Sequence, residues 1–268
     1  MAYHVRPANN ISTDTGRGYS PAIWGDFNEL DAIALGNAIV LRDDFVNFGK
    51  HNTDQDTQIY SSYIDTSNTI QQAATAGGVV ELTVDATDND SPVLQAGGGT
   101  GGAFQITTGT AGKLWFEARV QVSTLAEIAV FVGLGAPNAT ADNGVLVDDT
   151  GALSTSLGFI GWHAPAAAST CVFDGTYVKA SGTAQVVASD KHTAVADTWV
   201  KLGFKFDPQA DTLTYYVNGV SVGSADVSAA GTTNFPSAVL LSPVIAMKTG
   251  AAAAKTLRMD WWRCAQLM

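Results

Sequence analysis

The sequence is poor in charge, in cysteine and in long apolar runs, and each shortage excludes a class of protein. Only 15 % of the residues are charged, whereas about a quarter is usual for soluble domains. Two cysteines, Cys171 and Cys264, are too few for a disulfide-stapled scaffold, so we expect two free thiols in the core. No apolar run approaches the roughly 18 residues of a membrane-spanning helix, so we expect no membrane partner.

Basic residues are also scarce: 14 Lys and Arg stand against 25 Asp and Glu, a net charge of −11. Nucleic-acid binders neutralise phosphates with a surplus of Lys and Arg, so we expect no nucleic-acid partner. The acidity is concentrated in residues 26–90, which carry a net charge of −10. This stretch is either a solvated face or a surface that meets a basic partner or cations.

What the sequence has is alternation typical of β-strands. Apolar and polar residues alternate through residues 113–122 and again through 198–206, as in half-buried strands. Residues 212–217 and 220–222 flank Asn218-Gly219, which favours a hairpin because a type I′ turn needs positive φ at both central positions. These patterns predict an all-β protein, a two-sheet antiparallel jelly-roll sandwich over residues 40–268.

Residues 1–39 lack this alternation and are interpreted as an extended N-terminal arm with one short helix at about 26–35. Asp26 would cap the helix, with Glu29 completing a capping box, and Gly36 would end it. The arm contains residue types that are enriched at binding hot spots. We expect six of its side chains to bind another subunit: Tyr3, Arg6, Arg17, Tyr19, Ile23 and Trp24.

Residues 198–224 carry a family resemblance: a Trp-led strand, an Asp-containing turn, a strand ending in Tyr-Val-Asn-Gly and a short return strand. This arrangement resembles the concanavalin A-like lectin/glucanase superfamily, including its laminin-G-like members. Residues 255–264 resemble the closing strand of that jelly roll, and Asp43-Asp44-Phe45 resembles its opening. The resemblance covers residues 40–268 and implies the same sandwich.

Within that superfamily, the polar arm and the acidic sandwich rich in Ala, Gly and Thr look most like bacteriophage virion structural proteins. The resemblance implies a non-enzymatic capsid decoration or cement protein, or a head fibre. Its partners would be capsid or other virion proteins and further copies in a homo-oligomer. The alternative is a carbohydrate-binding, lectin-like module of a phage receptor-binding part. The first ten residues lack the apolar segment of a signal peptide, so we expect synthesis in the bacterial host cytoplasm and a final location in the virion.

No catalytic constellation is evident. The glucanase relatives use E-x-D-x-x-E on one strand, but Glu29-Leu30-Asp31 is followed by Ala34 at the last position, and Glu117 and Glu127 stand alone. Ser221 lies in a G-x-S-x-G sequence, yet it follows a hairpin turn instead of joining a strand to a helix. The sequence therefore predicts no enzyme and no catalytic residues.

No cofactor is expected, and the four dispersed histidines give no zinc spacing. Calcium is left open, because lectin-like sandwiches often bind it through loop carboxylates. Two loop clusters have suitable side chains, although turn formation also explains them: Asp85, Asp88, Asn89 and Asp90, and Asp142, Asn143, Asp148 and Asp149.

Tryptophans provide the candidate glycan or intersubunit contacts, and Trp162 and Trp262 are the two that we select. The alternative for both is a place in the core. Trp261 and Trp262 are adjacent, so on a strand their side chains point to opposite faces.

Overall fold

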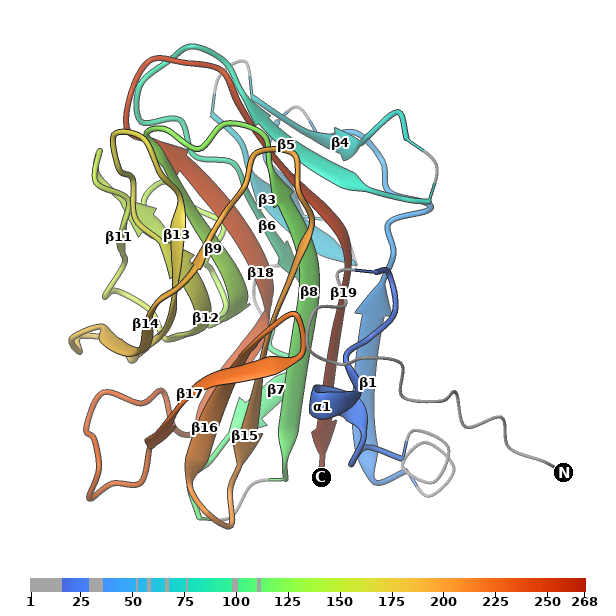
Figure 1. The fold of residues 1–268 in the computed structure, drawn as a ribbon, viewed down its shortest axis with the longest axis vertical. Coiled ribbons are helices and arrows are strands. Elements are labelled where there is room, and N and C mark those ends of the chain that lie inside the picture. The colour runs from blue at the N-terminus through green and yellow to red at the C-terminus, as the bar shows by residue number, and fades with distance from the viewer. Residues whose placement is uncertain are drawn as a thin grey trace, which may run out of the picture.

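The computed structural model describes residues 16–28, 36–51, 53–56, 59–65, 68–75, 77–97, 101–109 and 112–268. Within them the chain forms two antiparallel β-sheets packed face to face (Figure 1), with eight strands in sheet A and nine in sheet B. The described part contains a single short helix, α1 (Pro21–Trp24). The predicted all-β sandwich is confirmed.

Sheet A runs in the order β17-β16-β15-β8-β19-β5-β4, with β1 also paired to β19. Its strands are β1 (Ala38–Asp43), β4 (Thr69–Gln72), β5 (Val80–Val84), β8 (Leu114–Val122), β15 (Val200–Asp207), β16 (Thr212–Val217), β17 (Val220–Asp226) and β19 (Lys255–Leu267).

Sheet B runs in the order β14-β13-β12-β9-β18-β6-β3-β2, with β7 also paired to β18. Its strands are β2 (Gln55–Asp56), β3 (Tyr60–Tyr63), β6 (Val93–Ala96), β7 (Phe104–Ile106), β9 (Ile128–Gly135), β12 (Phe159–Ala164), β13 (Val172–Val178), β14 (Gln185–Thr193) and β18 (Val239–Thr249). A separate two-stranded ribbon, β10 (Leu146–Val147) with β11 (Ala152–Leu153), belongs to the segment between β9 and β12.

The core lies between the sheets and follows the alternation of the sequence. In β8 the inward side chains include Leu114, Phe116 and Val120, all buried. A second apolar cluster, which includes Phe131, Leu146 and Phe159, packs the β10–β11 segment against sheet B. Sheet B is therefore covered on both of its faces.

A β-bulge in β19 sets which side chains of that strand face outward. Met259 pairs with Val120 of β8 and Trp261 pairs with Arg119, so Asp260 between them has no partner on β8. The extra residue shifts the alternation, which puts Met259 and Trp262 in the core and leaves Trp261 against Tyr19 of the arm. The two adjacent tryptophans thus point to opposite faces, as predicted.

The helix predicted at about 26–35 stays a prediction over most of its length. Asp26 and the two residues after it are not helical, and residues 29–35 lie outside the described part. The helix that the structure describes, α1, begins at Pro21, and the Ser20 carbonyl accepts hydrogen bonds from the amides of Ile23 and Trp24. Proline at the first helical position is a common start because it needs no amide partner there. The Asp26 carboxylate accepts a hydrogen bond from Trp115 Nε1.

Two further predictions are confirmed. Asn218 and Gly219 have φ values of 47° and 78°, which the predicted type I′ hairpin requires. Cys171 and Cys264 are free and buried.

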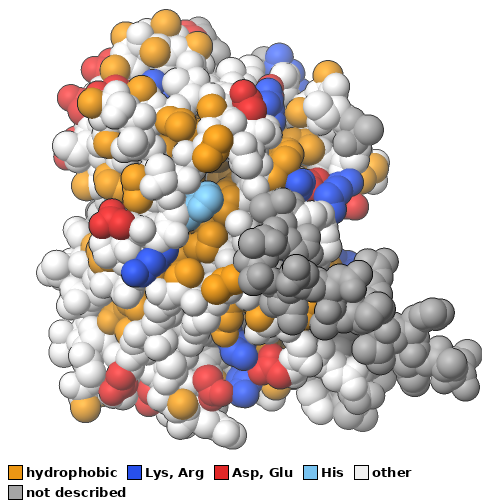
Figure 2. All heavy atoms as spheres, viewed as in Figure 1, with side chains coloured by type: hydrophobic (Ala, Val, Ile, Leu, Met, Phe, Trp, Pro, Cys, Tyr) orange, Lys and Arg blue, Asp and Glu red, His pale blue; other side chains and the backbone are white. Residues whose placement is uncertain are grey.

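Among the described helical residues, none forms a helix of the length and apolarity needed to cross a bilayer. The low charge of the chain is visible on the face shown in Figure 2, where hydrophobic side chains appear near the middle and charged ones lie mostly toward the edges.

Candidate functional site

The described part of the arm, residues 16–28, packs on the outer face of sheet A, and α1 lies beside β8 (Figure 1). Ile23 is fully buried and Trp24 nearly so. Ile23 sits over Gly203 of β15, where a Cβ atom would lie only 2.6 Å from Ile23 Cδ1. The absence of a side chain at Gly203 therefore makes the hole that Ile23 fills.

Glu117 lies at the centre of this contact and is completely buried. Its Oε2 atom accepts hydrogen bonds from the Ser20 amide at 3.0 Å and from Trp24 Nε1 at 2.9 Å. Burial raises the pKa of Glu117, while these hydrogen bonds and the charge of Lys201 oppose the rise. The one glutamate in the middle of β8 thus fixes the arm and cannot reach a substrate.

Aromatic side chains of the arm surround the guanidinium of Arg263. Its Cζ atom lies 4.2 Å from the ring centre of Trp24, 4.7 Å from that of Tyr19 and 5.7 Å from that of Phe27. Phe27 also packs on Trp115, with ring centroids 5.0 Å apart. Desolvated cation–π contacts of this kind stabilise by about 2 kcal/mol or more, so the arm is firmly held.

This geometry corrects our interpretation of the arm. Tyr19, Ile23 and Trp24 contact the chain's own sheet, and Arg17 forms an ion pair with Asp260 of β19. Residues 16–28 of the arm are therefore docked on the protein's own sheet A and do not extend away from it. They bind there because the outer face of sheet A presents aromatic and charged side chains. Tyr3 and Arg6 lie outside the described residues.

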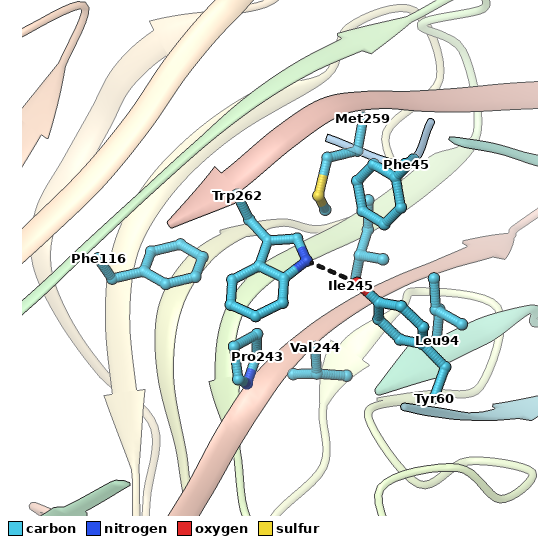
Figure 3. Close-up of a pocket in the computed structure, with 9 residues that line it drawn as sticks. All are labelled: Phe45, Tyr60, Leu94, Phe116, Pro243, Val244, Ile245, Met259 and Trp262. Carbon is cyan, nitrogen blue, oxygen red and sulfur yellow. Dashed lines mark hydrogen bonds between the residues drawn. The ribbon is translucent and has the colours of Figure 1, made fainter. Parts of the chain in front are cut away.

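Trp162 and Trp262 also differ from our expectation, since both are buried in the core. Trp162 donates Nε1 to the Gly203 carbonyl at 3.0 Å. Trp262 donates Nε1 to Tyr60 Oη at 3.1 Å (Figure 3), and Tyr60 donates to Asp43. The void beside Trp262 measures about 10 Å³, which is close to the space of a single water. With their polar atoms satisfied inside the sandwich, these rings are not platforms for a sugar.

Seven of the eight Asp and Asn residues that the sequence placed in two separate loop clusters meet in one cleft of about 660 Å³, and Asp85 does not line it. The β5–β6 loop provides one wall and the segment around β10 the other, with Lys248 of β18 between them. The lining residues are Asp65, Asp88, Asn89, Asp90, Asp142, Asn143, Val147, Asp148, Asp149 and Lys248.

Asp90 is the most buried carboxylate of this acidic cleft, with 6 % of its surface exposed, and its Oδ2 atom has no partner in the described part of the chain. Burial raises the pKa of Asp90 to about 6, helped by the nearby carboxylates of Asp85 and Asp65. A raised pKa is a mark of general acids, but the burial of Oδ2 keeps this group away from a substrate.

The carboxylates of the acidic cleft already have partners within the protein. No three His, Cys, Asp or Glu side chains within the described ranges come together closely enough to hold a metal ion. The buried Lys248 ammonium lies in the cleft, donates to the Asn89 carbonyl at 3.0 Å and lies 3.8 Å from Asp142 Oδ1. Asn89 Nδ2 donates to Asp149. Internal partners thus take up part of the carboxylate charge.

Ser221 lies within β17, paired with Tyr216 of β16, as its place after the hairpin predicted. Sequence analysis missed other residues of importance, namely Gly203, Asp260 and Lys248. A glycine or a lysine inside an alternating strand gives no local sign of what packs over it, and the bulge at Asp260 depends on pairing between distant strands.

No known family model matches the chain, and no curated protein matches it. Solved structures, in contrast, are similar to the chain in fold. Peanut lectin has a TM-score of 0.56 at 13 % identity, over 86 % of this chain and 98 % of the lectin.

The catalytic domain of an endo-1,3-β-glucanase from Thermotoga petrophila has a TM-score of 0.54 at 12 % identity, over 85 % of this chain and 96 % of the domain. A protein of unknown function from Shewanella oneidensis has a TM-score of 0.50 at 15 % identity, over 90 % of this chain and 95 % of that protein. At such identities the similarity shows fold and not activity. The chain has the concanavalin A-like jelly-roll fold of lectins and β-glucanases.

Proposed function

We propose that the chain is a non-enzymatic structural protein of a bacteriophage particle, a capsid decoration or cement protein or a head fibre. It would be made in the host cytoplasm and would bind the shell and neighbouring copies of itself. Residues 1–15, with Tyr3 and Arg6, are the segment that we propose for contact with another subunit. Several copies on one lattice would add avidity to a weak single contact.

The observation that supports this proposal most is the closure of sheet A by the chain's own arm. Glu117 is sealed beneath α1 by Ser20 and Trp24, so the carboxylate of β8 lies under the arm and not in an open groove. A hydrolase of this kind needs its strand carboxylates free to reach a substrate. A carboxylate that holds the arm in place is more typical of a structural protein. The acidic Ala-, Gly- and Thr-rich composition and the polar N-terminal segment support the same proposal.

Mass spectrometry of purified particles tests the virion role. We expect the protein in particles at a copy number comparable with that of the shell protein, and its absence from particles would overturn the proposal. A variant lacking residues 1–15 should keep its fold, because the docked segment begins at Gly16, and should lose particle binding. Unchanged binding by this variant would assign the contact to another surface.

The non-enzymatic part is tested with β-1,3-glucan as the substrate. We expect no release of reducing ends above the blank from the pure protein. Turnover that disappears in an Asp148→Asn variant would show that the acidic cleft is an active site.

The second candidate is a lectin-like module, and the acidic cleft is the observation that favours it. Carboxylate and amide oxygens accept hydrogen bonds from sugar hydroxyl groups, and the cleft has room for a sugar residue. A glycan array tests this function, with Asp142→Asn as the site variant and the exposed Asp190→Asn of β14 as the matched control. Binding that only Asp142→Asn weakens would establish the module, and an empty array would remove it.

A further inference from the structure

A pocket of about 280 Å³ lies on the outer face of sheet A, next to the docked arm. It is lined by Arg17, Thr75, Val79, Arg119, Gln121, Trp199, Arg258 and Asp260. The chain has only six arginines and a net charge of −11, yet three of the six line this one pocket. We call it the arginine pocket.

Five parts of the chain, far apart in sequence, build the arginine pocket, and one of them is the connection between β4 and β5 with Thr75 and Val79. Arg119 comes from β8 and Arg258 from β19, while Trp199 immediately precedes β15. The bulge in β19 turns Asp260 to this side, and the docked arm contributes Arg17. The pocket is therefore complete only when the arm is in place.

Asp260 holds two of the guanidinium groups in fixed positions. Its side chain is 2 % exposed and accepts hydrogen bonds from Arg17 Nε at 2.9 Å and from Arg119 Nη1 at 2.6 Å, as well as from Arg17 Nη2. Charge-assisted bonds of this kind give geometric specificity. The guanidinium groups are thus positioned before any ligand arrives.

The pocket keeps unused donors and positive charge. Arg258 donates Nε to Glu81 and Nη1 to Gln121, at 2.7 and 3.1 Å. Over the described residues, Nη2 of Arg258 and Nη1 of Arg17 make no hydrogen bond with the protein. Asp260 and Glu81 offset two of the three positive charges, and Asp197 lies 3.6 Å from Arg258 but is well exposed and screened.

A flat aromatic group and a hydroxyl group complete the lining. The guanidinium of Arg119 lies 4.5 Å from the ring centre of Trp199 and holds the indole in place. Trp199 is partly exposed and Thr75 is exposed. An aromatic surface beside arginines binds a ring that is apolar on its face and charged at its edge.

We propose that the arginine pocket binds an acidic sugar, a uronate residue of an oligosaccharide. The carboxylate lies against Arg17 and Arg258, the sugar ring against Trp199, and a ring hydroxyl against Thr75. A neutral sugar lacks the charge that the guanidinium groups require, and an inorganic anion leaves Trp199 unused. This site is on a different sheet from the acidic cleft, and it depends on neither proposed function.

Isothermal titration with tri-galacturonate tests the proposal, with its methyl ester and tri-glutamate as comparison ligands. We expect saturable one-to-one binding of the acid and at least tenfold weaker binding of the ester, which removes only the charge. Equal binding of ester and acid overturns the proposal. Tri-glutamate binding as tightly as the sugar overturns it in favour of an acidic peptide, and no binding of any of the three overturns it outright.

Variants locate the binding. Arg258→Gln should weaken tri-galacturonate binding at least tenfold, and Trp199→Phe should weaken it about threefold. Lys191→Gln, at an exposed position of β14, should leave binding unchanged. Arg17→Gln tests the contribution of the arm, and circular dichroism establishes that each variant is folded. Binding that survives Arg258→Gln and Trp199→Phe unchanged places the ligand elsewhere and overturns the proposal.

Discussion

The side chain of Ile23 occupies the space that any side chain on Gly203 would need. A Cβ atom at Gly203 would lie 2.6 Å from Ile23 Cδ1 and 2.8 Å from the Phe116 carbonyl oxygen. The arm and the sheet are therefore matched in shape at this point, and the match can be tested by changing either partner.

Ile23→Ala should lower the free energy of unfolding by about 2 to 5 kcal/mol, as expected for a buried isoleucine cut to alanine. If the arm detaches first, the loss is limited to the free energy of docking, and trypsin will cleave at Arg17 faster than in the unchanged protein. Urea denaturation and the rate of cleavage measure the two effects. The exposed Val220→Ala should change neither.

The double variant Ile23→Ala with Gly203→Ala measures the coupling between the two sites. Gly203→Ala alone overpacks the contact and should cost about 1 to 3 kcal/mol. Without the isoleucine side chain the new methyl group has fewer steric clashes. The double variant should therefore lose less free energy of unfolding than the two single variants lose together. Simple additivity would mean that Ile23 does not sit over Gly203.

Glu117→Gln should stabilise the protein at alkaline pH and lose this advantage in acid. Because the pKa of Glu117 is raised, the ionised carboxylate costs stability above its ordinary pKa, and the cost disappears as the pH falls through that value. Glutamine keeps an oxygen for Trp24 Nε1 but carries no charge. The difference between the unfolding free energies of variant and unchanged protein, measured from pH 8 to pH 4, should therefore fall as the pH falls. A difference that grows in acid would mean that the hydrogen bonds and the charge of Lys201 outweigh burial.

Asp90→Asn should act in the same direction. The pKa of Asp90 is raised to about 6, so its ionisation costs stability above pH 6 and costs little below its ordinary value of about 4. The variant should be more stable than the unchanged protein at pH 8, and the two should converge by pH 4. Carboxyl carbon NMR gives the pKa directly, and a value near 4 for Asp90 would contradict the burial of its Oδ2 atom.

The two thiols should be unreactive in the folded protein. Burial raises the pKa of Cys171 to about 12 and that of Cys264 well above its ordinary range, and the thiolate is the reactive form. A thiol reagent at pH 8 should count no groups in the native protein and two in denaturant. Rapid native labelling of either cysteine would show that the core opens near it.

The alternating strands could be predicted from sequence because each carries its own signal. Residues 113–122 and 198–206 match β8 and β15 closely, since one face of each strand is apolar along its whole length. Of the helix predicted at about 26–35, only residues 26–28 lie in the described part, and they are not helical. The Ser20-Pro21 pair was the signal that would have indicated α1.

The contacts between distant residues could not be predicted in the same way. The aromatic and arginine residues of the arm indicated a binding segment, but nothing local shows that their partner is the chain's own sheet. The two acidic loops were recognised singly, and their meeting in one cleft depends on the order of strands. Both sites arise from pairings between segments that are far apart in the sequence, where short-range patterns carry no information.

The positions of β18 and β19 have a consequence for the time course of folding. These strands follow all others of the described sequence, yet β18 lies between β9 and β6, and β19 lies between β8 and β5. Until they insert, each sheet consists of two halves that expose unpaired edges toward one another. Closing such long loops is slow, and open edges are prone to pair with other chains. We therefore expect refolding over milliseconds to seconds or longer, with yields that fall as protein concentration rises.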